Sequence, residues 1–246
     1  RSNRDGDTFD LDRVGDMNYN RKPIKPFQEA GFGMKKVISL VLLLVLAASL
    51  GCAQAQALDG AVVGSTVMFG NYEQGDGQAP IEWIVLDRQE DRALLLSKYA
   101  LDAKPFHEVE DRNVTWAECT LRAWLNGDFY NSAFSDEERA RIVHVANATA
   151  NAPDTQDCVF LLSLDELNAY FPDEASRIAD ATEYAVAQGG RVSRETGKTY
   201  WWLRTKATPE DAALMVRYDG AVNEFGDSME ADIYTVRPAV WVSVSA

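Results

Sequence analysis

Extended segments at both ends of residues 58–246, with helix-start signals between them, constrain the fold most strongly. Near the start, "GSTVMFGNYEQ" and "IEWIVLD" have the composition of strands, and Ile81, Trp83 and Val85 alternate onto one face. Towards the other end, "TVRPAVWVSVS" alternates in the same way from Val236 to Val244. Strands at both ends with helices in the middle predict one α+β domain in which the N- and C-terminal strands are adjacent.

Turn signals indicate how the predicted strands are connected. "RQED" turns the chain into "RALLLS", and Asp219-Gly220 separates two extended runs in "ALMVRYDGAVNEF", a pairing that tight hairpins favour. Residues 157–163 and 200–204 are further expected strands. Pro238 cannot donate to a strand ladder, so we expect it at an edge or a bulge. The pattern predicts a mixed, mostly antiparallel sheet.

Capping boxes mark three helix starts in the middle of the chain. They begin at Thr115, Ser135 and Ser163, and each has a glutamate three residues later. The first helix, over residues 116–126, is expected to pack Trp124 against the core as a structural residue. A later helix, over residues 174–188, is expected to end at Gly189-Gly190, where glycine suits a left-handed cap.

Residues 34–57 have the pattern of a secretory signal peptide. Met34 is followed by two lysines, by the 14-residue apolar run "VISLVLLLVLAASL" and by the small residues of "GCAQAQA". The run is shorter than the roughly 20 residues that a membrane-spanning helix needs, so a signal peptide is preferred to a helical anchor. The polar residues 1–33 are interpreted as an upstream or disordered extension. We therefore expect an exported protein whose mature domain is 58–246.

Two modes of export remain open. Cleavage after Ala55 or Ala57 gives a soluble secreted protein, whereas cleavage before Cys52 with lipidation of its thiol gives a lipoprotein tethered to the cell envelope. A lipoprotein box places Leu three residues before the cysteine, but here Ser49 holds that position. We expect soluble export, and membrane contact only if Cys52 carries a lipid.

The composition of the chain argues against two classes of ligand, nucleic acids and transition metals. Asp and Glu number 38 against 24 Lys and Arg, which gives a net charge of −14. Such a chain repels phosphate backbones, so we expect no nucleic-acid partner. Only two histidines occur, and no H-x-x-x-H, H-E-x-x-H or C-x-x-C spacing is present, so we expect no transition-metal site.

Cys119 and Cys158 are the two cysteines that follow the predicted signal peptide. In an exported protein a disulfide between them is one interpretation. The alternative is a pair of buried free thiols, because both cysteines lie in apolar stretches. The sequence does not decide between the two.

The strand "TYWWLRT" carries the most prominent aromatic residues. A period of two places Tyr200, Trp202 and Arg204 on one face and Trp201 with Leu203 on the other. Leu203 assigns Trp201 to the core as a structural residue, whereas Arg204 makes the Trp202 face the more polar one. We predict that this face contacts a ligand, because exposed Trp, Tyr and Arg side chains hold sugar rings and peptides. The alternative is that helices cover the face and Trp202 is packing.

The hairpin loop "DGAVNEFGDSMEAD", residues 219–232, is the other candidate contact region. Asp219, Asn223 and Glu224 are the residues that we expect to meet a ligand there. Oxygen ligands at this density suit Ca²⁺, but the EF-hand spacing is absent, and a solvated acidic loop is the preferred interpretation. We therefore expect no cofactor, with Ca²⁺ as the alternative.

Arg237 lies within an otherwise apolar terminal strand. A buried guanidinium needs a carboxylate or carbonyl partner. We predict a structural ion pair, with a ligand contact as the alternative.

Several segments together resemble a known family. "FGNYEQ", "TWAECTLRAWLNGDFYNSAFS", "DCVFLLSLDELNAYF", "YWWLRT" and "VRPAVWV" resemble a bacterial domain-of-unknown-function family whose members are often exported or surface-attached. The resemblance covers about residues 66–246 and implies no established activity.

A more distant similarity is to the C-type-lectin-like fold, in which the first and last strands pair and which formylglycine-generating enzymes share. Three branches of that fold have features that are absent here: the iron-binding histidines of the sulfoxide synthases, the C-terminal cysteine pair of the formylglycine enzymes, and the E-P-N or Q-P-D and W-N-D motifs of the calcium-dependent lectins. The similarity therefore implies the scaffold alone, with Arg237 as a structural residue of the last strand.

These observations lead to a functional expectation. We expect a secreted or surface-tethered, non-catalytic binding module that recognises a cell-surface glycan or a protein through Tyr200, Trp202, Arg204 and the loop 219–232. One alternative is an exported, glycosidase-like hydrolase, which needs two carboxylates in one cleft. A purely structural component of the envelope is the other.

Overall fold

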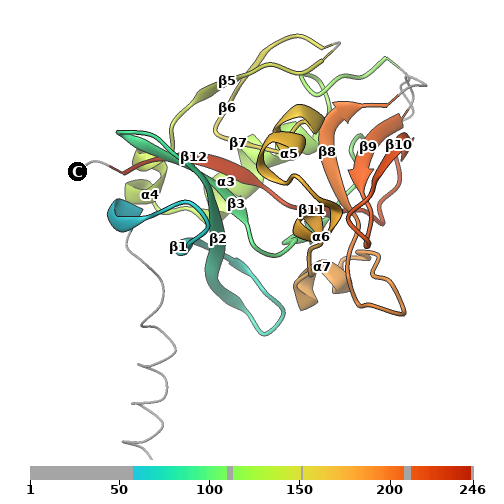
Figure 1. Cartoon of the computed structure of the whole chain (residues 1–246), viewed down its shortest axis with the longest axis horizontal. Helices are drawn as coiled ribbons and strands as arrows, with labels where there is room; N and C mark the ends of the chain where they lie inside the picture. The colour runs from blue at the N-terminus through green and yellow to red at the C-terminus, as the bar shows by residue number, and fades with distance from the viewer. Residues whose placement is uncertain (1–57, 110–112, 151, 208–211, 245–246) are drawn as a thin grey trace, which may run out of the picture. The chain divides into compact units, whose positions relative to one another are not determined.

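The computed structural model describes residues 58–244, except 110–112, 151 and 208–211 (Figure 1). All described residues belong to one compact unit, Leu50–Ala246. The signal peptide and Cys52 lie outside the described residues, so both stay predictions. No helix among the described residues is long and apolar enough to cross a membrane.

Two five-stranded sheets form the framework, so the mixed α+β architecture is confirmed but the single sheet is corrected to two. The first sheet is antiparallel throughout and has the order β1 (Thr66–Glu73), β2 (Gln78–Arg88), β3 (Arg92–Ser97), β12 (Ala239–Ser243), β7 (Val159–Phe160). The second has the order β10 (Val222–Ser228), β9 (Ala212–Val216), β8 (Trp201–Lys206), β11 (Thr235–Val236), β4 (Asp102–Ala103). Only the β11–β8 pair within it is parallel.

The last strand does not lie beside the first. β12 pairs with β3 and β7, so two strands separate it from β1 in the same sheet, and the expected adjacency is wrong. The reason is local: β1, β2 and β3 follow one another as hairpins, which leaves the free edge of β3 for β12. The hairpin predicted at "RQED" is confirmed.

One extended segment, residues 235–243, takes part in both sheets. Its first part is β11, which pairs with β4 and β8, and its second part is β12. Pro238 falls between the two strands, and its carbonyl accepts a hydrogen bond from the Ser97 N–H at 2.9 Å. Because proline has no N–H to donate, it suits this change of partners better than a position inside a ladder.

Short helices and a small sheet connect the strands. The helices are η2 (Leu58–Gly60), α2 (Thr120–Trp124), the π-helical turn η3 (Leu125–Phe129), α3 (Tyr130–Ala133), α4 (Asp136–Arg141), α5 (Leu164–Tyr170), α6 (Glu174–Arg177) and α7 (Glu183–Ala187). β5 (Val145–Asn147) and β6 (Thr155–Asp157) form a separate two-stranded sheet.

Two of the three predicted capping boxes are present. Ser135 caps α4 and Ser163 caps α5, each with the reciprocal glutamate contact. The box at Thr115 is wrong, because α2 begins at Thr120 and is capped by Cys119. The indole of Trp116 is buried and donates to Asp157 at 3.0 Å, which holds residues before Cys119 in a turn rather than a helix.

The helix expected over residues 174–188 is two helices, α6 and α7. Between them the chain leaves the helix to pair with Ala100, whose N–H donates to the Asp180 carbonyl and whose carbonyl accepts from the Thr182 N–H, both at 2.9 Å. The predicted glycine ending is confirmed: Gly189 has φ +104°, and the Gly190 N–H donates to the Ala185 carbonyl at 2.9 Å.

Candidate functional site

The tryptophan doublet lies entirely in the core. Both Trp201 and Trp202 are 0% exposed, because β8 is a central strand covered on both faces. The Trp202 ring packs 4.5 Å from the Tyr234 ring and its Nε1 donates to the Lys104 carbonyl at 3.0 Å. Trp201 Nε1 donates to the Arg177 carbonyl at 3.2 Å. The interpretation of Trp202 as an accessible side chain is therefore corrected.

Arg204 is also buried, at 1% exposed, and every part of its guanidinium is engaged. It forms an ion pair with Glu166, with Nη2 at 2.9 Å from Oε1, and its Nε donates to Thr149 Oγ1 at 3.0 Å. Its Nη atoms also donate to the Leu161 and Ala148 carbonyls. Arg204 therefore connects β8 to α5 and to the loop after β5, and is not available to a ligand.

Arg237 has a different environment from the one predicted. It is 2% exposed, its Nε donates to the Ser97 carbonyl at 2.8 Å, and its guanidinium lies 5.0 Å from the Trp201 ring centroid. No carboxylate among the described residues pairs with it, so carbonyl and aromatic contacts replace the expected ion pair. Burial lowers the pKa of Arg237 to about 10.

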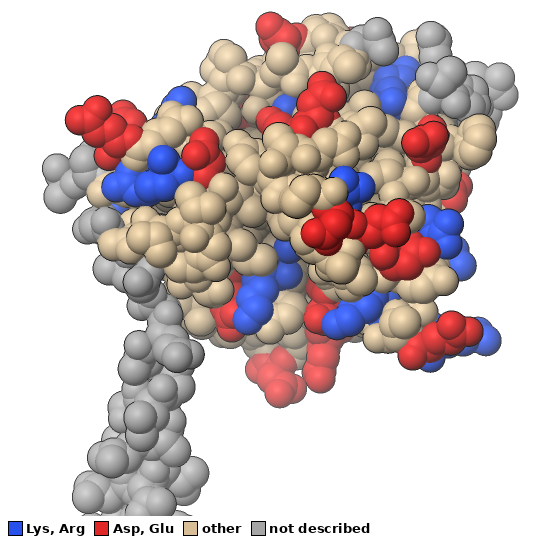
Figure 2. Space-filling model, in the orientation of Figure 1, with Lys and Arg blue, Asp and Glu red and all other residues tan. Residues whose placement is uncertain are grey.

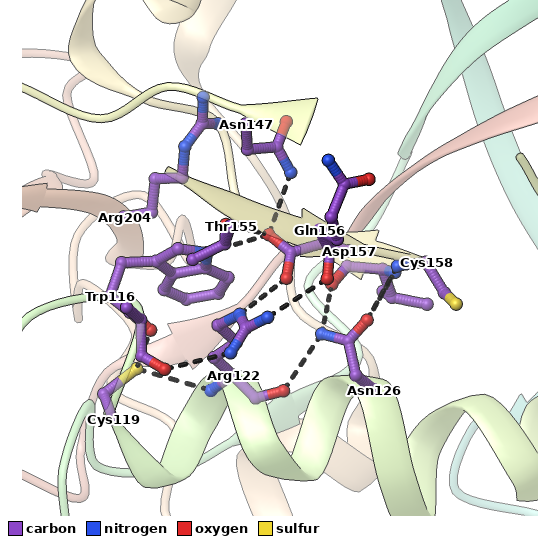
Figure 3. Close-up of polar contacts among 12 residues, drawn as sticks. Trp116, Cys119, Arg122, Asn126, Asn147, Thr155, Gln156, Asp157, Cys158 and Arg204 are labelled. Carbon is purple, nitrogen blue, oxygen red and sulfur yellow. Dashed lines mark hydrogen bonds and ion pairs between the residues drawn. The ribbon is translucent and has the colours of Figure 1, made fainter. Parts of the chain in front are cut away.

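A buried polar cluster surrounds Asp157 (Figure 3). Its carboxylate is 0% exposed and accepts from Arg122 Nε at 2.5 Å, Trp116 Nε1 at 3.0 Å, Asn147 Nδ2 at 2.9 Å and Thr155 Oγ1 at 2.7 Å. Burial acts to raise the pKa of Asp157, but these four hydrogen bonds outweigh it and hold the pKa below its ordinary value. With its oxygens fully engaged, the cluster joins α2 to β5 and β6 and is structural.

Cys119 and Cys158 are free thiols, so the disulfide interpretation is corrected in favour of two buried thiols. The Cys119 Sγ caps α2, whereas the Cys158 Sγ lies 3.2 Å from His144 Nε2. Figure 3 shows the two sulfurs on opposite sides of the Asp157 cluster. Each is held by its own neighbours and is directed away from the other.

The Cys158–His144 pair has the contact expected of a nucleophile and its base. Burial raises the pKa of the Cys158 thiol, which favours the neutral form rather than the reactive thiolate. The Cys158 N–H donates to Asn126 Oδ1 at 2.7 Å, so it is not free to stabilise an oxyanion. These features argue against a nucleophilic role.

The segment predicted as an acidic loop, residues 219–232, consists largely of strand β10, and its polar residues have separate partners. Asp219 pairs with Arg217 at 3.1 Å, and Asn223 Nδ2 donates to the Gly226 carbonyl at 2.7 Å. Glu224 is exposed. Among the residues that the structure describes, no three His, Cys, Asp or Glu side chains gather as a metal site. The acidic residues of this segment therefore do not gather around one point.

An open hollow of about 530 Å³ lies between residues 191–195 and the side chains of Tyr200 and Tyr218. The two tyrosine rings are 5.4 Å apart; Tyr200 is 9% exposed, while Tyr218 is half-buried. Tyr218 immediately precedes Asp219 in the β9–β10 turn. Of the predicted ligand-contacting residues, Tyr200 lines this hollow, and Asp219 is not part of its lining.

A well-anchored turn builds the other wall. Val192 bridges Thr199, the Ser193 N–H donates to the Lys198 carbonyl at 2.8 Å, and Gly197 adopts φ +71° to close the turn. Its base is joined to the loop before β11 by the Arg191 N–H, which donates to the Ile233 carbonyl at 2.8 Å. The turn therefore presents its side chains on a fixed backbone.

Arginine gives the hollow its charge. Arg191 and Arg194 are both exposed, and the Arg191 guanidinium lies 4.8 Å from the Tyr200 ring centroid. Glu195 is the one carboxylate of the lining. Elsewhere, Figure 2 shows acidic side chains spread over the visible face, with basic ones between them. Sequence patterns did not single out Arg191, Arg194 or Tyr218, although "GGRVSRETGK" has the glycines of a tight turn around two arginines.

A second hollow, near Trp124, is much smaller. It has a volume of about 40 Å³ and includes Glu108 and Thr120 in its lining. The Lys104 Nζ lies 4.7 Å from the Trp124 ring centroid, and Trp124 packs partly buried against the core, where its ring is 5.3 Å from that of Phe129. The space is about that of a single water molecule, so the larger hollow is the candidate site.

Comparison with known proteins places the chain in a family. No curated protein and no solved structure matches it. The family model described as Domain of unknown function (DUF6273) matches residues 90–244, which include β3 to β12 and the whole lining of the hollow. The chain belongs to the family Domain of unknown function (DUF6273).

Proposed function

We propose that this protein is a secreted or surface-tethered, non-catalytic binding module that holds a glycan in the hollow formed by residues 191–195, Tyr200 and Tyr218. The observation that carries the proposal is an open hollow lined by two neighbouring tyrosine rings together with Arg191, Ser193 and Arg194. Aromatic rings offer an apolar face to the C–H side of a sugar and a hydroxyl at their edge. Ser193 and the two arginines supply hydroxyl and guanidinium donors to sugar oxygens.

The size of the hollow supports a small ligand over a protein partner. Sites for small molecules occupy about 300–1,000 Å³, a range that includes the 530 Å³ found here. A stable protein interface buries about 800 Å² on each partner, an area that one turn and two tyrosines do not supply. A glycan is therefore the preferred ligand among the two expected classes.

The hydrolase alternative lacks support in the same geometry. Acid–base cleavage of a glycosidic bond needs two carboxyl groups about 5–9.5 Å apart across the substrate. The larger hollow has one carboxylate, Glu195, and the smaller one has Glu108. Neither brings two together, so binding without catalysis is the function that we propose.

The proposal retains a C-type-lectin-like scaffold as its finer fold assignment. The support is the mixed α+β, mostly antiparallel architecture; β1 and β12 belong to one sheet, but β2 and β3 lie between them. Export remains part of the proposal through the signal-peptide pattern of residues 34–57.

The test is a glycan-array screen of the purified protein and the Tyr218→Ala variant. We expect the variant to lose at least about tenfold in affinity for the glycans that the protein binds, because it loses a stacking ring. Phe225→Ala is the matched control: Phe225 is 78% exposed on the edge strand β10 and lies outside the lining. Unchanged binding by Tyr218→Ala refutes the site, and an array without any bound glycan refutes the function.

A further inference from the structure

Arg191 and Arg194 differ from the other arginines of the described residues. Each of the others donates a side-chain hydrogen bond or forms an ion pair, as Arg122 does with Asp157 and Arg92 with Gln89. The guanidinium groups of Arg191 and Arg194 have no such partner among the described residues. In a chain with a net charge of −14, carboxylates are abundant. Two unpaired arginines in one hollow therefore indicate a site prepared for a ligand anion.

The chemistry of guanidinium selects the anion. Its planar donors match a carboxylate with two parallel hydrogen bonds, and such charge-assisted bonds are about twice as strong as neutral ones. The Arg191 guanidinium already rests against the Tyr200 ring at 4.8 Å. An arginine that is held in this way loses less conformational freedom when it binds a ligand.

Glu195 and the acidic surface restrict how much charge the ligand carries. Glu195 is exposed on the turn beside Arg194 and repels a second anionic group near the first. The charge of the whole domain disfavours dense polyanions over a range of about 8 Å at physiological salt. A ligand with one carboxylate on each sugar ring satisfies these conditions better than a heavily sulfated chain does.

We propose that the hollow selects glycans built from carboxylate-bearing sugars, with Arg191 and Arg194 binding the carboxylate and Tyr218 contacting the sugar ring. This inference rests on the proposed function, since it names the ligand class of the same site. Two kinds of sugar fit this description. In a uronic acid the carboxylate is a substituent elsewhere on the ring, whereas in a sialic acid it is attached to the ketosidic carbon.

The experiment compares ligands that differ only in charge. Trigalacturonic acid and its methyl ester share the same rings, and sialyllactose with its own methyl ester forms the second pair. Calorimetric titration at 50 and 500 mM NaCl is expected to show at least about tenfold tighter binding of the acid within one pair, and a smaller ratio at high salt. The pair that shows the preference identifies where the carboxylate is carried.

Substitutions in the hollow test which residues cause the preference for the acidic ligand over its neutral counterpart. Arg194→Gln is expected to bring the acid to the affinity of its neutral counterpart and to leave the neutral ligand unchanged. Arg92→Gln is the matched control, because Arg92 also lies over an aromatic ring, 4.7 Å from the Trp241 centroid, but belongs to the first sheet. Glu195→Gln is expected to bind the acid a few-fold more tightly. Melting curves check that the exposed-site variants are folded.

The binding measurements distinguish failure of the carboxylate preference from failure of glycan binding itself. Equal affinity for acid and neutral ligands, with binding still lost in Tyr218→Ala, overturns the carboxylate preference and leaves glycan binding in place. Binding only to other neutral glycans on the array also overturns the preference. Absence of binding to every glycan overturns both proposals.

Discussion

Replacing Asp157 by alanine tests whether the buried cluster holds the helical and β parts of the domain together. The variant removes the acceptor of four donors, of which Trp116, Asn147 and Thr155 are buried. An unsatisfied buried donor costs about 1–3 kcal/mol, and loss of one partner of a buried ion pair costs about 3–5 kcal/mol. The Arg122 side chain is 24% exposed, so water relieves part of its loss. We expect a total of about 4 kcal/mol from these contributions.

Thermal unfolding followed by circular dichroism measures this loss. For a domain of this size each kcal/mol corresponds to about 2–4 °C, so the melting temperature is expected to fall by roughly 12 °C. Asp136→Ala is the matched control, because Asp136 also pairs with an arginine, Arg139, but its side chain is 90% exposed. We expect no measurable change in the control. A fall for Asp157→Ala that is no larger than for Asp136→Ala refutes the structural role.

The difference in melting temperature between the protein and the Asp157→Ala variant is expected to depend on pH. Hydrogen bonds hold the pKa of folded Asp157 below its ordinary value of 3.8, against the opposing effect of burial. A carboxyl whose pKa is lower in the folded state stabilises the protein above its ordinary pKa, and that contribution is lost as the pH falls through the folded pKa. The melting temperatures of the protein and the variant should therefore differ most at neutral pH and converge below about pH 4.

The cysteines and two glycines provide further tests. Burial raises the pKa of Cys119 to about 12 and also raises that of Cys158, so at pH 8 neither thiol should react with Ellman's reagent until denaturant is added; a disulfide found by mass spectrometry would contradict this. Gly220→Ala places a Cβ 1.8 Å from the Glu174 carbonyl oxygen at φ +86°, whereas Gly189→Ala at φ +104° meets nothing within 4 Å. Urea unfolding should show a loss of about 1 kcal/mol for Gly189→Ala and more than about 3 kcal/mol for Gly220→Ala; equal losses would contradict the contact.

Local patterns predicted the elements that local interactions determine. The hairpins at "RQED" and Asp219-Gly220 and the caps at Ser135 and Ser163 depend on neighbouring residues, and the structure contains all of them. The capping pattern at Thr115 failed because the burial of Trp116 against Asp157, 41 positions further along the chain, decides the conformation there.

The sequence predicts the site only in part, because it does not show which faces of a strand are covered by other parts of the fold. Alternation in "TYWWLRT" divides its side chains between two faces but does not say what covers each face, and in the structure both are covered. The hollow joins the start of β8, the β9–β10 turn and the turn 192–199. Tyr200 was recognised because it is part of a prominent aromatic run, whereas Tyr218 and Arg191 become a site only when the fold brings these segments together.

The segment shared by the two sheets determines when the fold can be completed during synthesis. Without residues 235–243, β3 and β7 have no common neighbour in the first sheet, and β8 and β4 have none in the second. These residues follow every other strand in the chain, so each sheet remains in two parts while the ribosome makes the preceding residues. Neither sheet can be completed without residues 235–243, so the two sheets depend on one and the same segment.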